Sequence, residues 1–250
     1  MPRYKLTLEY DGTPFVGWQR QLNGLSVQQV LEDAAHNLSG HSVTAAGAGR
    51  TDTGVHALGM TAHLDLEKSL PPHRVRDALN HHMRPHPVGV LTAEEVSEDF
   101  HARFSCFHRH YLYRIICRRA PLALDAKRVW RVGYELDVGA MQAAAQHLVG
   151  KHDFTTFRST HCQAKSPIKT LSTLIVSRHA DEVQIRCSAP SFLHNQVRSI
   201  AGTLERVGAG RWQPASVRES LEAKTRSACG PVAPPHGLYF VKADYPPFDQ

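Results

Sequence analysis

The stretch YKLTLEYDG, residues 4–12, alternates apolar and polar side chains and ends in an Asp-Gly pair. A period of two is typical of a strand with one buried face, and Asp-Gly is a common turn. We therefore predict a half-buried strand that ends at this turn. Its buried face would consist of Tyr4, Leu6, Leu8 and Tyr10.

The segment between Ser26 and Gly40 has apolar residues at helical spacing and therefore predicts a helix. Ser26 is a suitable N-cap for it, and Gly40 is a suitable end. The same two periodicities continue along the chain. Further strands are predicted at residues 60–67, 88–96, 110–119, 171–179, 182–189 and 236–245. Further helices are predicted at residues 71–83, 138–150, 191–208 and 215–226. The inner face of the helix at 191–208 would consist of Val197, Ile200, Ala201 and Leu204.

Several of these strands follow one another too closely for a crossover helix, which favours antiparallel pairing and an α+β fold. The pattern predicts two α+β halves, residues 1–103 and residues 104–250, joined near Asp99–Phe107. We expect their meeting surface to form a cleft.

The composition is ordinary for a globular protein, with 42% hydrophobic and 21% charged residues in 250. No apolar run approaches a membrane span, and the first residues do not read as a secretory signal. Five cysteines without a C-x-x-C pair indicate reduced thiols in a cytoplasmic protein. Lysine and arginine number 29 against 23 acidic residues, a net charge of +6. That surplus fits a nucleic-acid partner, but equally a mildly basic enzyme without one.

The segment AGAGRTDTGVHA, residues 46–57, has few side chains suited to a core. It is not a nucleotide fingerprint or a P-loop, because the third glycine is misplaced and no G-K-[ST] exists. A zinc site is a poor match, since His56, His63 and Cys106 follow no ligand spacing. A plain loop locked by an Arg50–Asp52 pair is the ordinary structural interpretation.

Other features favour a reactive carboxylate in this segment. Its glycines permit positive φ angles and close approach of a ligand. Arg50 beside Asp52 would keep that carboxylate ionised and oriented, as a carboxylate nucleophile requires. We expect Thr51 and Thr53 to hydrogen-bond the carboxylate.

Six segments, in this order, resemble the tRNA pseudouridine synthase A family. They are LEYDGTPFVGWQRQ (8–21), GRTDTGVHA (49–57), FHARFSCFHRHYLYRI (100–115), HDFTTFR (152–158), FLHNQVRSIAGTL (192–204) and GLYFVKADYP (237–246). The resemblance implies two ferredoxin-like or RRM-like halves with mainly antiparallel sheets that form a central cleft. It also implies isomerisation of uridine to pseudouridine at positions 38, 39 and 40 of the tRNA anticodon stem-loop, in a cytoplasmic homodimer, without metal or cofactor.

The resemblance assigns Asp52 as the catalytic nucleophile and Tyr111 as the side chain that contacts the target base, with Tyr113 left to packing. Without the resemblance, the alternation of this strand would predict that both tyrosines pack in the core. Arg50 and Arg198 would complete the catalytic set, and base extrusion would need phosphate contacts. The candidates for those contacts are Arg20, Arg103, Lys165 and Lys169, each of which could also be an ordinary surface charge.

The chain departs from the family pattern at Leu112, in place of a frequent arginine, at Ser199, in place of asparagine, and in the HRH segment around Arg109. These departures put RNA contacts in doubt and not the reaction, because Asp52 and Tyr111 are unchanged. Two other classes of function compete with the isomerase. A non-catalytic RNA-binding protein would be expected to lack Asp52 or Arg50, and both are present. A glycoside or nucleoside hydrolase normally needs a second acid, which residues 46–57 do not supply.

Overall fold

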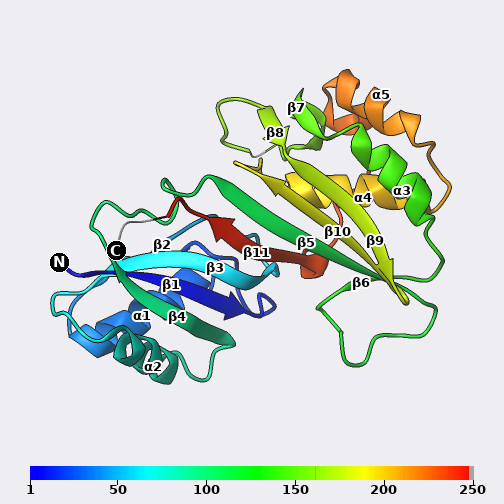
Figure 1. The fold of residues 1–250 in the computed structure, drawn as a ribbon. Coiled ribbons are helices and arrows are strands. Elements are labelled where there is room, and N and C mark those ends of the chain that lie inside the picture. The colour runs from blue at the N-terminus through cyan, green and yellow to red at the C-terminus, as the bar shows by residue number, and fades with distance from the viewer. Residues whose placement is uncertain (161, 248–250) are drawn as a thin grey trace. The chain divides into compact units, whose positions relative to one another are not determined.

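The computed structural model describes residues 1–160 and 162–247 (Figure 1). The chain forms two compact units, one of Met1–Phe107 together with the segment from Tyr239 onward, and one of His108–Leu238. The expected second half, 104–250, therefore differs from the second unit at both ends. Its last strand belongs to the first unit, a long-range return that no local pattern in the sequence reveals.

The first unit is a mainly antiparallel sheet with two helices packed together. Figure 1 shows α1 and α2 on the same side of this sheet. Its strands run in the order β4-β1-β3, and β2 and β11 both pair with β3, β2 antiparallel and β11 parallel. The elements are β1 (Arg3–Tyr10), α1 (Val27–Ser39), β2 (Ala46–Gly47), β3 (His56–Asp65), α2 (Pro72–His82), β4 (Val88–Val96) and β11 (Leu238–Asp244).

The local signals read from the sequence explain this unit. The four apolar residues of β1 are at most 4% exposed, which confirms the predicted buried face. The Ser26 hydroxyl accepts a hydrogen bond from the Gln29 N–H, and Gly40 ends α1 with a φ of 78°, as a left-handed C-cap does.

The second unit contains the antiparallel sheet β9-β10-β5, with β6 parallel to β5, and a separate β7–β8 pair. Helix α3 packs on β9 and on α4, and α4 also contacts β5. The elements are β5 (His108–Cys117), β6 (Trp130–Val132), α3 (Val138–Gln146), β7 (Gly150–Asp153), β8 (Ile168–Leu171), β9 (Thr173–His179), β10 (Glu182–Ala189), α4 (Gln196–Gly208) and α5 (Ala215–Ala223). The α+β class predicted from the sequence is confirmed.

Helix α4 begins at Gln196, five residues after the predicted start. The reason is Asn195, whose φ of 63° lies in the left-handed region and stops the helix from extending backwards. The predicted inner face of α4 is confirmed, since all four of its residues are at most 5% exposed. Among the described helices, none is long and apolar enough to cross a membrane.

Candidate active site

The segment 46–57 runs from β2 into β3 through a tight turn. The Ala48 N–H donates to the Thr61 carbonyl oxygen at 2.8 Å, which holds the first part of the segment beside β3. The Val55 N–H then donates to the Asp52 carbonyl oxygen at 3.1 Å, and Gly54 between them has a φ of 76°. Asp52 is therefore the first residue of a four-residue turn that requires glycine at its third position.

A second loop, residues 12–18, packs against this turn. The Trp18 N–H donates to the Thr51 carbonyl oxygen at 3.1 Å, and the Thr53 hydroxyl donates to the Val16 carbonyl oxygen at 3.0 Å. Gly17 has a φ of 112°, and a Cβ atom there would lie 2.5 Å from the Thr51 carbonyl oxygen. The two backbones are thus in direct contact on either side of Asp52.

The two threonines do not act as predicted. The Thr51 hydroxyl is hydrogen-bonded to the Tyr10 hydroxyl at 2.8 Å, in a buried position. The Thr53 hydroxyl is used by the neighbouring loop, as described above. Both hydroxyls therefore fix the turn, and the expected bonds from them to the Asp52 carboxylate are replaced by bonds to the surrounding loops.

The predicted Arg50–Asp52 pair stays a prediction. Asp52 is half-buried and Arg50 is exposed. The turn described above fixes Asp52 through its backbone. The exposed Arg50 side chain is left facing solvent.

In the sequence, His56 stands out only as a poor match to a zinc ligand. In the structure, it holds the base of the turn. The Gly12 N–H donates to His56 Nδ1 at 3.0 Å, and the imidazole ring stacks on Tyr239 with centroids 4.8 Å apart. Asp11 Oδ1 lies 3.2 Å from the same nitrogen. Over the described residues, no group of three or more His, Cys, Asp or Glu side chains could hold a metal ion.

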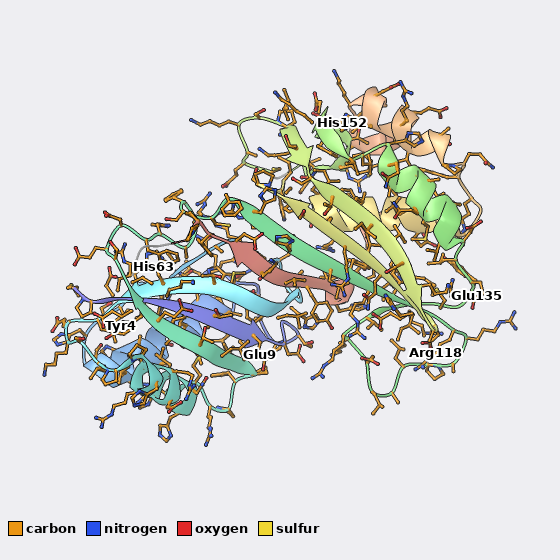
Figure 2. The ribbon with its side chains drawn as sticks, in the orientation of Figure 1. Tyr4, Glu9, His63, Arg118, Glu135 and His152 are labelled. Carbon is orange, nitrogen blue, oxygen red and sulfur yellow. The ribbon has the colours of Figure 1, made fainter. Side chains whose placement is uncertain are left out.

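His63, near the end of β3 (Figure 2), holds the segment that follows β4. The Ala102 N–H donates to His63 Nδ1 at 3.2 Å. Burial, reinforced by the charges of His101 and Arg3, lowers the pKa of His63 from its ordinary value to about 4. The imidazole is therefore neutral at physiological pH, as an acceptor of the Ala102 N–H must be.

In the second unit, the two tyrosines of β5 differ in exposure. Tyr113 is fully buried, and its hydroxyl donates to the Pro234 carbonyl oxygen at 2.8 Å. This burial confirms packing for Tyr113, and it also raises the pKa of Tyr113 well above its ordinary value. Tyr111 is partly exposed and meets Phe192 edge to face, with ring centroids 5.0 Å apart.

Arg198, on the first turn of α4, is oriented by its neighbours. Its Nε donates to the Ala233 carbonyl oxygen at 2.8 Å, and its Nη1 donates to Asn195 Oδ1 at 3.0 Å. The residue is half-buried. It is thus held in one direction, unlike an ordinary arginine on a solvated helix face.

Of the four side chains predicted to contact phosphate, Arg20 forms an ion pair within the protein, and the other three are exposed or half-exposed. Arg20 Nη1 lies 3.0 Å from Glu32 Oε2, and because the Glu32 side chain is only 9% exposed, Arg20 neutralises a nearly buried carboxylate. Arg103 is exposed and lies over the Phe104 ring at 5.5 Å. Lys165 is exposed and Lys169 is half-exposed on β8, and neither has an ion pair within residues 1–160 and 162–247.

Two of the departures from the family pattern lie inside the protein. Leu112 is 6% exposed and Ser199 is fully buried. The Ser199 hydroxyl has no hydrogen-bond partner among the described residues. Because both side chains are buried, an effect of either position on RNA contacts would have to be indirect.

Comparison with known proteins bears on both units. A family model described as tRNA pseudouridine synthase matches residues 7–105 and 144–246. The chain is 61% identical over 245 residues to the tRNA pseudouridine synthase A of Parvibaculum lavamentivorans, an alignment that covers 98% of this chain and all of the relative. It is 64% identical to the protein of the same name from Afipia carboxidovorans, with the same coverage. With the one from Maricaulis maris it shares 59% identity over 98% of this chain and 99% of the relative.

Proposed function

Because the chain belongs to the tRNA pseudouridine synthase family, we propose that it isomerises uridine to pseudouridine at positions 38, 39 and 40 of the tRNA anticodon stem-loop. Pseudouridine synthases are isomerases, and substrate and product contain the same atoms. The observation that carries the proposal is the turn at Asp52, where a half-buried carboxylate is held by backbone contacts on both sides. A fixed, accessible carboxylate is what cleavage of a glycosidic bond needs.

The reaction begins at the sugar. An Asp52 oxygen attacks C1′ of the target ribose, the C1′–N1 bond breaks, and its electron pair leaves with uracil. The freed base turns, and C5 attacks C1′ as the bond to Asp52 breaks. The proton at C5 is then lost and N1 gains one, so that atoms and electrons balance without any oxidant.

Tyr111 holds the base while it is detached. A partly exposed aromatic ring can stack on uracil whatever the neighbouring sequence, and such stacking is worth about 1–3 kcal/mol per base. The edge-to-face contact with Phe192 supports this role, because it limits the tilt of the Tyr111 ring.

The other candidate arginines and lysines are proposed to contact the RNA. Arg198, oriented by two hydrogen bonds, is proposed to act on the reacting nucleotide, and Arg50 to meet the phosphate beside it. Arg103, Lys165 and Lys169 are proposed to contact phosphates further along the stem, which offsets the cost of extruding the base. Arg20 is retained as a candidate only through the part of its guanidinium that Glu32 leaves exposed.

The test uses a tRNA transcript labelled with tritium at uridine C5, because the isomerisation releases that label to water. We expect release by the wild type in the presence of EDTA, and a fall of at least about a thousandfold in Asp52→Asn and Asp52→Ala. Asp77→Asn is the matched control, since it removes an exposed carboxylate of the same unit that pairs with Arg76. Transcripts with cytidine at position 38, 39 or 40 test the target positions.

The same experiment separates the alternatives. Release of free uracil would identify a hydrolase, and binding of tRNA without tritium release would identify a non-catalytic RNA-binding protein. Full activity of Asp52→Asn would remove this carboxylate from the mechanism. We also propose a homodimer in the cytoplasm, where the tRNA substrate is found. Light scattering coupled to gel filtration would contradict the dimer if it gave the mass of one chain.

A further inference from the structure

The last residue of β1, Tyr10, has a buried hydroxyl that reaches the neighbour of Asp52. Tyr10 is 4% exposed, and its hydroxyl lies 2.8 Å from the Thr51 hydroxyl in a buried hydrogen bond. The backbone of Tyr10 is fixed by the sheet, since Tyr10 pairs with Ala57 of β3 and with Val88 of β4. A group on the rigid sheet is thus bonded to the side chain that precedes the proposed nucleophile.

The backbone of Thr51 is held as firmly as its side chain. Its carbonyl oxygen accepts the Trp18 N–H at 3.1 Å, and Gly17 lies against that oxygen so closely that a Cβ atom would be 2.5 Å away. On the other side, the Asp52 carbonyl oxygen closes the turn to Val55. The direction in which the Asp52 carboxylate leaves the chain therefore depends on how Thr51 is held.

We infer that the Tyr10 hydroxyl is a positioning group for Asp52, acting through Thr51. This inference rests on the proposed role of Asp52 as the nucleophile. Without the Tyr10 hydroxyl, the buried Thr51 hydroxyl loses its partner and gains by turning towards another one, which shifts the residue before Asp52. A displacement of about 1 Å at a reacting group can cost about a hundredfold in rate. Because Tyr10 is buried, its loss leaves the RNA-binding surface unchanged.

The first test compares two tyrosine-to-phenylalanine variants on the same strand. We expect Tyr10→Phe to lower kcat for pseudouridine formation by about tenfold and to change KM by less than about twofold. Tyr4→Phe is the matched control, because Tyr4 (Figure 2) lies on the same face of β1, is fully buried, and uses its hydroxyl to bond Leu70, in the loop before α2. It loses the same chemical group at the far end of the strand, and its kcat should stay within twofold of the wild type, roughly the experimental scatter.

The second test is a double-mutant cycle on the hydrogen bond. Thr51→Ser keeps the hydroxyl and should retain kcat within about threefold, whereas Thr51→Val should lower it about as much as Tyr10→Phe. In the double variant Tyr10→Phe/Thr51→Val neither partner is left unpaired, so the loss in kcat should be well below the product of the single losses.

The outcomes separate this inference from the proposed function. If Asp52→Asn is inactive but Tyr10→Phe has the kcat of the wild type, the positioning role of Tyr10 is refuted and the nucleophile stands. Equal losses of kcat in Tyr10→Phe and Tyr4→Phe would also overturn it, since they show general destabilisation. Strictly multiplicative losses in the cycle would overturn it as well, because they show that the two side chains act independently. An active Asp52→Asn refutes the proposed function itself and this inference with it.

Discussion

Substitution of Gly17 by alanine should distort the turn at Asp52, although Gly17 is not part of that turn. The added Cβ would lie 2.5 Å from the Thr51 carbonyl oxygen, whereas ordinary contact begins at 3.4 Å, so one backbone must move by 3.4 − 2.5 = 0.9 Å. The obstacle is backbone and not the end of a flexible side chain. The adjacent bond from the Trp18 N–H to the same oxygen lies in the path of that movement.

The energetic cost has two parts. Alanine at a φ of 112° is strained by about 1–3 kcal/mol, and weakening the Trp18–Thr51 bond adds about 1 kcal/mol. Gly17→Ala should therefore lose about 2–4 kcal/mol of unfolding free energy. Since a 0.9 Å shift is close to the displacement that costs about a hundredfold in rate, kcat should fall by one to two orders of magnitude.

Gly40→Ala is the control that separates the effect of backbone strain from the effect of a displaced backbone. Gly40 has a φ of 78° with nothing within 4 Å of an added Cβ, so alanine there meets strain of about 1–2 kcal/mol and no clash. Urea denaturation and tritium release on the three proteins are the measurements. The reasoning is refuted if Gly17→Ala keeps the kcat of the wild type, or if Gly40→Ala loses as much kcat as Gly17→Ala.

Three further outcomes are expected. Because the pKa of His63 is about 4 when folded and near 6.5 when unfolded, only the unfolded chain takes up the proton on acidification, so stability is lost as pH falls from about 6.5 towards 4. His63→Asn keeps an acceptor but does not titrate, and urea midpoints at pH 7 and pH 5, values that bracket about 6.5, should differ less in this variant than in the wild type. Lys165→Ala and Lys169→Ala should each weaken tRNA binding and reduce the slope of log K against log salt by about 1, without loss of stability. Arg20→Ala should instead lower the unfolding midpoint, because it leaves the nearly buried Glu32 carboxylate without its closest cation.

The sequence predicted those elements whose causes are local. Ser26 and Gly40 set the ends of α1 through their own side chain and backbone, and both signals can be read within a few residues. Helix α4 was predicted too early because the left-handed φ of Asn195 is a property of the folded chain that asparagine permits without requiring. The strands β2 and β6 have two and three residues, too few to show a period.

The candidate site was predictable in composition but not in contacts. Resemblance singled out Asp52, yet the bond from Thr51 to Tyr10 joins residues 41 positions apart, and no spacing rule connects them. The charges of Arg50 and Arg20 were visible in the sequence, but their partners were not. The structure shows Arg20 beside Glu32 and the Arg50 side chain exposed.

The first unit is discontinuous in the chain, and this has a consequence for its synthesis. The edge of β3 where that strand begins, directly after the proposed nucleophile, is covered by β11, and the ring of His56 stacks on Tyr239. The Phe107 N–H likewise donates to the carbonyl oxygen of Asp244 at 3.0 Å. A ribosome that has translated only the first hundred or so codons has therefore made a sheet with an open edge. The nascent enzyme stays immature until nearly the whole message has been read, so prematurely terminated chains carry the aspartate without the strand that completes its surroundings.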